Sequence, residues 1–169
     1  MNKAELRTMG ALVLVALASE VPLSYAECEA PLDAGAVGAR YEVKGDQVYD
    51  KKTNLTWQRC SVGQKWSEGS GCTGDAAKMS HDRAHQSAAD GWRMPGVSEM
   101  MSIVRKDCKN PAIDPQLFPN TPADVFHSAV KRGLKCFGVD FSNGSEYSSG
   151  RRNNLCDYST YVRLVKTGQ

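Results

Sequence analysis

The chain of 169 residues lacks the sequence motifs of several common enzyme classes. It has no Gly-x-Ser-x-Gly motif, which positions the nucleophilic serine of many hydrolases, and no glycine-rich loop of the kind that binds phosphate groups. No two cysteines have the Cys-x-x-Cys spacing of a structural zinc site, and no cluster of acidic and amide residues suits calcium. These absences predict a protein that is not an enzyme and that uses no metal or cofactor.

A large net charge is also lacking, because 21 Lys and Arg residues nearly balance 19 Asp and Glu residues, for a net charge of +2. Such a balance argues against a general binder of nucleic acid. The charge is nevertheless uneven along the chain. Residues 27–100 contain 9 basic and 11 acidic side chains, whereas residues 101–169 contain 10 basic and 6 acidic ones, a net charge of +4.

Long apolar runs are missing after the first 26 residues. A basic start precedes the apolar residues 9–18, and small residues stand at Ser24 and Ala26, so we expect a cleaved secretory signal over residues 1–26. The alternative is a buried N-terminal helix, since the run is shorter than the roughly 20 apolar residues that span a bilayer. Residues 27–169 are then expected to form a single domain, periplasmic or secreted and not inserted in a membrane.

All six cysteines lie after the expected signal segment. An even number of cysteines after a secretion signal predicts three disulfides in an oxidising compartment, and six cysteines allow fifteen pairing schemes. The six are Cys28, Cys60, Cys72, Cys108, Cys136 and Cys156. Cys60 and Cys72 bracket a glycine-rich segment, so we expect a bridge there, which would stabilise the fold by about 3 kcal/mol in the chain-entropy model.

Alternating residues and turn signals predict an α+β domain with several short strands. Strands are expected in residues 41–49, as a hairpin around Gly45 and Asp46, and in residues 55–60, 135–141 and 158–165, with a turn at residues 142–144. Residues 27–40 are expected to form a surface strap and residues 63–74 a loop. Residues 111–122 contain four prolines and are expected to form an irregular loop.

Helical periodicity predicts two helices. The first is expected over residues 75–90 and ends at Gly91, with a narrow face of small and histidine side chains. That face consists of Ala77, His81, Ala84, His85 and Ala88. The second helix is expected to be capped by Ser98 and to bury Met101, Ile103 and Val104.

Several separate motifs together resemble the Lcl C-terminal domain family, named for the C-terminal domain of the Legionella collagen-like adhesin. They are "VYDKKTNLTWQRCSVGQKW", "GWRMPGVSEMMSIV", "AIDPQLFPNTP", "VDFSNG" and "YVRLVK", and they cover residues 48–166 in the family's order. This resemblance implies a fold related to C-type lectins and to the formylglycine-generating enzyme. Such a fold has two helices packed on twisted, mainly antiparallel sheets with long loops.

The resemblance also bears on the disulfides and on the surface. Family members often have a cysteine near Cys28 and near Cys108, which implies that these two pair. Cys136 and Cys156 are additions to the family pattern, which implies that they form the remaining bridge. The family usually has Trp at the positions of His81 and Phe137, and a Trp-Ser-Ser segment at residues 127–129, so this chain has lost aromatic surface.

Histidine and tryptophan each allow two interpretations. His81 and His85 stand four residues apart, so they could bind a catalytic metal with His127 as a third ligand, but we favour packed, hydrogen-bonded histidines. Trp57 shares the alternating strand pattern of Leu55 and is expected in the core. For Trp66 we leave open whether it packs inside or stacks on a sugar.

The basic residues of the second half supply the main candidate site. Lys131, Arg132, Lys135, Arg151 and Arg152 would converge if Cys136 pairs with Cys156, and they could then bind a sulfated glycan or an acidic protein. The alternative is an ordinary solvated basic surface. Trp66 is the competing ligand-binding candidate.

From these features we expect a non-enzymatic recognition domain that binds a glycan or protein partner through its loops. The adhesin that names the family is a precedent for binding sulfated polysaccharide. The alternative is a periplasmic immunity protein or inhibitor that neutralises a toxin or an envelope hydrolase. A hydrolase or copper oxidase on the same fold is the least favoured interpretation, and nothing in the sequence indicates an oligomeric state.

Overall fold

The computed structural model describes residues 27–29, 33–148 and 155–169, so the expected signal peptide lies outside the described residues. Within these ranges, no helix is long and apolar enough to cross a membrane. The elements are β1 Glu27–Cys28, α1 Ala34–Arg40, β2 Tyr41–Lys44, β3 Gln47–Asp50, β4 Leu55–Gln58, β5 Lys65–Ser67, β6 Gly71–Thr73, α2 His81–Gln86, α3 Val97–Met101, β7 Cys108–Lys109, β8 Val125–Arg132, β9 Lys135–Asp140, β10 Ser145–Ser148, a 3-10 turn at Leu155–Asp157, and β11 Val165–Thr167.

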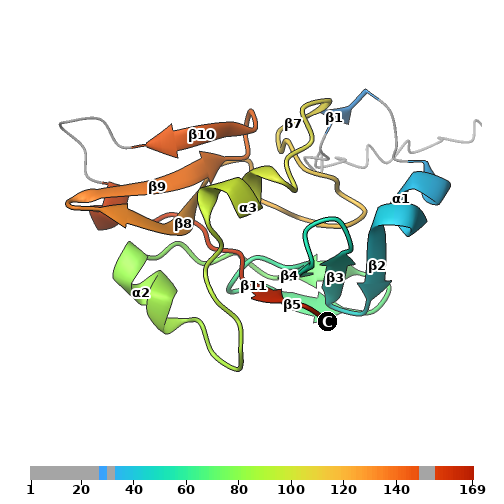
Figure 1. Cartoon of the computed structure of the whole chain (residues 1–169), viewed down its shortest axis with the longest axis horizontal. Coiled ribbons are helices and arrows are strands. Elements are labelled where there is room, and N and C mark those ends of the chain that lie inside the picture. The colour runs from blue at the N-terminus through green and yellow to red at the C-terminus, as the bar shows by residue number, and fades with distance from the viewer. Residues whose placement is uncertain (1–26, 30–32, 149–154) are drawn as a thin grey trace, which may run out of the picture.

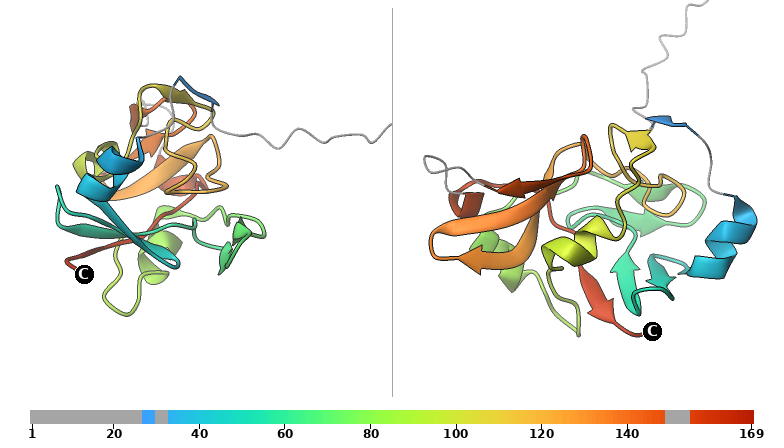
Figure 2. Two further views of the ribbon diagram at one scale, coloured as in Figure 1. Left: turned by 90° about the vertical axis from the view of Figure 1, so that its right-hand side faces the viewer. Right: turned by 45° about the horizontal axis from the view of Figure 1, so that its top comes forward.

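Two antiparallel sheets form the frame of this small α+β fold. One has the strand order β11-β4-β3-β2 and the other the order β10-β9-β8, while β1–β7 and β5–β6 form two short pairs. Figure 1 shows the three-stranded sheet at the upper left and the four-stranded sheet at the lower right, with α3 between them. The views of Figure 2 show the same arrangement from two other sides.

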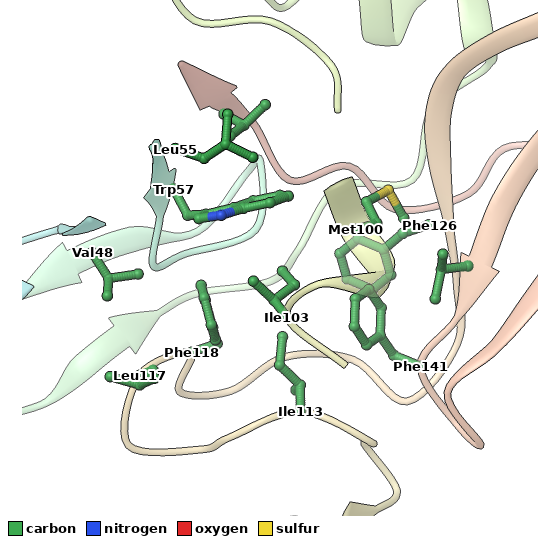
Figure 3. Packing of buried hydrophobic residues seen from close by; sticks show 12 residues of the cluster. Val48, Leu55, Trp57, Met100, Ile103, Ile113, Leu117, Phe118, Phe126 and Phe141 are labelled. Atoms are coloured by element: carbon green, nitrogen blue, oxygen red, sulfur yellow. The ribbon is translucent and has the colours of Figure 1, made fainter. Parts of the chain in front are cut away.

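The main hydrophobic core lies between the two sheets and is closed by α3 and the proline-containing loop 111–122 (Figure 3). Trp57 of β4 is completely buried at its centre, which confirms the prediction that it belongs to the core. The buried members of this cluster are Val48, Leu55, Trp57, Met100, Ile103, Ile113, Leu117, Phe118, Phe126, Val139, Phe141 and Val165. A second, smaller cluster packs α2 against residues 162–164 and Met94.

The expected strap contains a helix. Asp33 accepts a hydrogen bond from the amide of Gly35 at the start of α1. At its end, Arg40 donates to both carboxylate oxygens of Asp50, at 3.0 and 2.7 Å, and to the carbonyl of Ser102 at 2.8 Å. Burial raises the pKa of Asp50, but the hydrogen bonds and charge of Arg40, together with smaller contributions from Thr53 and the Lys52 amide, outweigh it and the net shift is downward. This ion pair ties α1 to β3 and to the end of α3.

Both helices predicted downstream are shorter than expected. Only His81–Gln86 is helical in the first, because Met79 pairs in an isolated bridge with Thr160 and thereby holds the preceding chain extended. The second helix begins at Val97 after Gly96, and Ser98 is not its cap. Glu99 accepts a hydrogen bond from the Gly96 amide at 2.7 Å instead.

Three further predictions about helix and strand content need correction. The segment 63–74 is not a plain loop, because β5 and β6 form a hairpin inside it. Residues 158–165 alternate as predicted, but they do not form one continuous strand. Only Val165 belongs to a strand, as the first residue of β11. Their backbone bonds go to several different partners, among them Met79, Val62 and Gln58. The second helix buries Met100 and Ile103, while Met101 and Val104 are only partly buried. The hairpin of residues 41–50 and the irregular proline loop are as predicted.

All three predicted disulfides are present. Cys28–Cys108 joins β1 to β7, Cys60–Cys72 closes the segment that contains the β5–β6 hairpin, and Cys136–Cys156 joins β9 to the 3-10 turn. Their sequence separations are 80, 12 and 20 residues. They are consistent with an extracellular or periplasmic compartment.

A buried arginine, Arg163, connects the core to the segment that the Cys60–Cys72 bridge closes. Arg163 is 1% exposed, and its Nη1 donates to the carbonyls of Gln58, at 2.8 Å, and Arg59. Its Nη2 donates to the hydroxyls of Thr121, at 2.7 Å, and Ser61, at 3.4 Å. Burial lowers the pKa of this guanidinium to about 9, so it remains charged at neutral pH.

We predict that replacing Arg163 by methionine lowers the free energy of unfolding by about 3 kcal/mol. Two buried carbonyls and a buried hydroxyl would lose their donor, and each unsatisfied group costs about 1–3 kcal/mol. Urea denaturation of the purified protein measures the change. Arg83→Met on the exposed side of α2 is the control and should change stability by less than about 0.5 kcal/mol. Equal stability of the Arg163 variant and the wild type would show that the guanidinium has no supporting role.

Candidate binding site

The tip of the β8–β9 hairpin carries three of the five predicted basic residues. Lys131 pairs with Cys136 and Arg132 with Lys135, so Gly133 and Leu134 form a two-residue turn. Gly133 has φ of +61°, a conformation that two-residue hairpin turns need and glycine adopts without strain. Lys131, Arg132 and Lys135 are all exposed, and they lie within five residues of one another at the end of the hairpin. We call residues 131–135 the basic tip.

The hairpin is distorted below the basic tip, and the distortion fixes it to the rest of the molecule. A register shift between His127 and Lys131 frees residues 128–130 from regular pairing with β9. The Ala129 amide donates to the carbonyl of Pro95 at 2.7 Å, and the Ser128 hydroxyl donates to the carbonyl of Phe137 at 2.8 Å. The basic tip therefore projects from a bulge that is anchored on the loop before α3.

Close backbone packing continues at the base of the hairpin. At Gly138 of β9, a side-chain Cβ would lie 2.1 Å from the carbonyl oxygen of Phe126, so no other residue fits there without moving the strands. Cys136, completely buried, joins the hairpin to the 3-10 turn through Cys156. The covalent link places the 3-10 turn Leu155–Asp157 beside the hairpin.

The structure brings part of the predicted basic cluster together. Arg151 and Arg152 lie outside the described residues, so only the basic tip can be placed. Lys131 lies 3.9 Å from Asp82, and both side chains are largely solvent-exposed, so this pair contributes little to stability. Arg132 lies over the ring of Phe137 at 5.7 Å.

Sequence reasoning missed the apolar residue inside the basic tip. Leu134 is 80% exposed at the apex of the turn, and Tyr158 is 52% exposed two residues after Cys156. A leucine between basic residues in a glycine turn is the signal that could have shown it. The tip thus offers positive charge and an exposed apolar side chain on one rigid hairpin.

Trp66, the competing candidate, lies elsewhere. It is partly buried on β5. In Figure 1, β5 lies away from the end of the hairpin formed by β8 and β9. The guanidinium of Arg59 lies 4.1 Å from the centre of its ring, and its indole N–H donates to Glu68 at 2.8 Å. Trp66 also contributes to a hollow of about 260 Å³. The structure therefore separates the aromatic candidate from the basic one.

The three histidines form a cluster beneath the hairpin. The ring centroid of His81 lies 4.8 Å from that of His85 and 5.5 Å from that of His127. His81 Nε2 donates to the carbonyl of Ser128 at 3.1 Å, and His127 Nε2 donates to the carbonyl of Met79 at 3.1 Å. The Nδ1 atoms of His81 and His127 are buried with no hydrogen-bond partner.

This cluster is arranged for packing. In the described ranges, no group of three or more His, Cys, Asp or Glu side chains is placed to hold a metal ion. Burial lowers the pKa of His81, with the nearby His85 adding to the effect. Burial likewise lowers the pKa of His127, with His81 adding to it. Both buried rings are therefore neutral at neutral pH, and a second proton on either would have no acceptor.

A family model, the Lcl C-terminal domain, matches residues 46–166. The match includes the three-stranded sheet, the four-stranded sheet without β2, the Trp66 hairpin, the histidine cluster and the basic tip. No curated protein and no solved structure matches the chain.

The histidine cluster makes stability depend on pH. The ordinary histidine pKa is about 6.5, and the folded values of His81 and His127 are lower. As pH falls below about 6.5, the unfolded chain binds protons that the folded protein does not, so stability is lost progressively toward acid. We predict a smaller loss between about pH 7 and pH 5 for His127→Gln, measured by urea denaturation. An unchanged loss in His127→Gln would refute the assignment.

Proposed function

The chain belongs to the Lcl C-terminal domain family, and from that premise we propose that it is a secreted or periplasmic recognition domain. It binds an acidic glycan or an acidic protein surface through the basic tip, and it does so without catalysis. We further propose that the fold is of the C-type-lectin-like class. The antiparallel sheets, short helices, long loops and three disulfides support that proposal.

The observation that carries the proposal is the rigid presentation of three cations. Lys131, Arg132 and Lys135 are exposed within one hairpin end, and among the described residues only Lys131 has an acidic side chain at ion-pair distance, Asp82 at 3.9 Å. Exposed like charges so close together repel one another, so they gain energy when an anionic partner neutralises them. The bulge and the Cys136–Cys156 bridge hold the hairpin in place, which reduces the entropy lost on binding.

A second candidate function is supported by the apolar apex. Leu134 is exposed between the basic side chains of the tip, and an apolar anchor with a charged rim is typical of a protein–protein interface. We therefore keep the inhibitor or immunity protein as the alternative, with an acidic toxin or envelope hydrolase as its target. Co-purification with such an enzyme, lost in Leu134→Asp, would favour this alternative over glycan binding.

We predict that the triple variant K131A/R132A/K135A elutes from immobilised heparin at lower salt than the wild type. Neutralising the tip removes the charges that contact the sulfates, and rim charges act mainly on the association rate and salt dependence. The variant K52A/K65A/K106A removes the same charge at exposed positions elsewhere and is the matched control. R151A/R152A tests the two arginines outside the described residues. Wild-type retention by the triple variant would exclude the basic tip as the site.

The bridge between Cys136 and Cys156 generates a separate prediction. Replacing both cysteines by alanine should lower the free energy of unfolding by about 3 kcal/mol, since the bridge closes a loop with a sequence separation of 20 residues. Retention on heparin should also decrease, because the hairpin would lose one of its two anchors. Thermal denaturation and heparin chromatography measure the two effects. Reduced stability with unchanged retention would show that the bridge does not position the basic tip.

A further inference from the structure

A hollow of about 260 Å³ lies beside the Cys60–Cys72 bridge, on the part of the molecule that does not contain the basic tip. Its lining includes Trp66, Asp46, Gln58, Ser61 and Gln64. These residues come from β5, the β2–β3 turn, β4 and the segment after it. The hollow therefore combines one aromatic ring with several short polar side chains.

The indole of Trp66 is held in a fixed orientation. Trp66 lies opposite Cys72 in the β5–β6 pair, and Cys72 is bound to Cys60. The guanidinium of Arg59 covers one face of the ring at 4.1 Å, while Glu68 accepts its N–H. Trp66 lines the hollow and Arg59 does not, so a ligand in the hollow would meet the part of the ring that Arg59 leaves uncovered.

The guanidinium of Arg59 is held in place by hydrogen bonds to three backbone carbonyls. Its Nε donates to the carbonyl of Leu117 at 2.9 Å, its Nη1 to that of Gly45 at 2.9 Å, and its Nη2 to that of Gln116 at 2.7 Å. These three bonds use three of the five N–H groups of the guanidinium and fix its orientation, so Arg59 is a firm support for the indole. The aromatic ring is thus preorganised on a rigid support, which lowers the entropic cost of binding.

Two polar side chains of the hollow have unused hydrogen-bonding capacity. Gln64 is engaged, because it accepts from the Ser61 amide and donates to the carbonyl of Asn120. The side chains of Asp46 and Gln58, in contrast, have no hydrogen bond within the described residues. A carboxylate accepts two or more hydrogen bonds, and a carboxamide both donates and accepts. Together they match the paired hydroxyl groups of a sugar.

We propose that this hollow binds one residue of a neutral glycan, with the sugar ring against the free face of Trp66. Asp46 accepts hydrogen bonds from sugar hydroxyls, and Gln58 donates to and accepts from them. The apolar C–H face of a sugar suits an aromatic ring whose own edges are hydrogen-bonded. Asp46 is the charged side chain that lines the hollow, and Glu68 accepts the indole N–H, while the cation of Arg59 lies on the covered side of the ring, so a neutral sugar suits the hollow better than a sulfated or carboxylated one. The site is independent of the proposed function of the basic tip.

The test uses three neutral hexasaccharides, of glucose, mannose and N-acetylglucosamine, titrated into the ¹⁵N-labelled protein. We expect at least one of them to shift the indole N–H resonance of Trp66 saturably, with a Kd on the order of 1 mM. Trp66→Ala should abolish the saturable binding. Gln58→Ala should weaken it about fivefold, the loss of one neutral hydrogen bond, and Asp46→Ala by about tenfold or more, because hydrogen bonds to a carboxylate are stronger.

Asp46→Ala and Gln58→Ala keep the test decisive if Trp66→Ala disturbs the fold, because neither side chain supports its neighbours. Tyr158→Ala, which removes an exposed aromatic ring elsewhere, and K131A/R132A/K135A should both bind the sugar as the wild type does. If the heparin experiment fails while sugar binding is intact, only the proposed role of the basic tip is rejected. Absence of a saturable shift with all three sugars, or equal affinity in Asp46→Ala and Gln58→Ala, overturns the proposal.

Discussion

The structure depends on a positive charge buried without a carboxylate partner. Arg163 is buried among aromatic rings, 4.9 Å from the ring centre of Phe118 and 6.0 Å from that of Phe126. Its hydrogen bonds reach the backbone at the end of β4 and the hydroxyl of Thr121, which in turn donates to the carbonyl of Phe118. Desolvating a guanidinium is costly, and here both Nη atoms have acceptors while Nε is buried without one. The chain around it is held in one arrangement.

That arrangement places two candidate surfaces on one frame. Alternation along residues 162–165 sends Val162 and Leu164 into the cluster beneath α2, while Arg163 and Val165 face the main core. The α2 side of this segment supports the histidines and the bulge below the basic tip. The other side fixes the end of β4, where Arg59 supports Trp66. Neither surface contains the other's residues, so each can be altered separately.

Local patterns predicted more of the molecule than long-range ones did. The hairpin predicted over residues 41–49 and the Cys60–Cys72 bridge follow from neighbouring residues, and the other two bridges followed from the family resemblance. Strand β8, which forms the basic tip with β9, was not predicted. The helix over residues 75–90 failed because pairing of Met79 with a distant segment overrides helical preference. Arg163 was missed because a basic residue in an alternating run resembles a solvent-facing one. The polar lining near Trp66 joins segments far apart in sequence, which periodicity does not report.

The central claim is that the frame presents residues 131–135 as the surface for an acidic partner. Hydrogen exchange measured by mass spectrometry, with and without heparin at low salt, tests it without altering the protein. The account predicts that slowed exchange is concentrated in the β8–β9 hairpin and the segment joined to it by Cys156, with the Trp66 hairpin unchanged. Protection centred on the Trp66 hairpin or on the outer face of the four-stranded sheet, with none at residues 131–135, would contradict it.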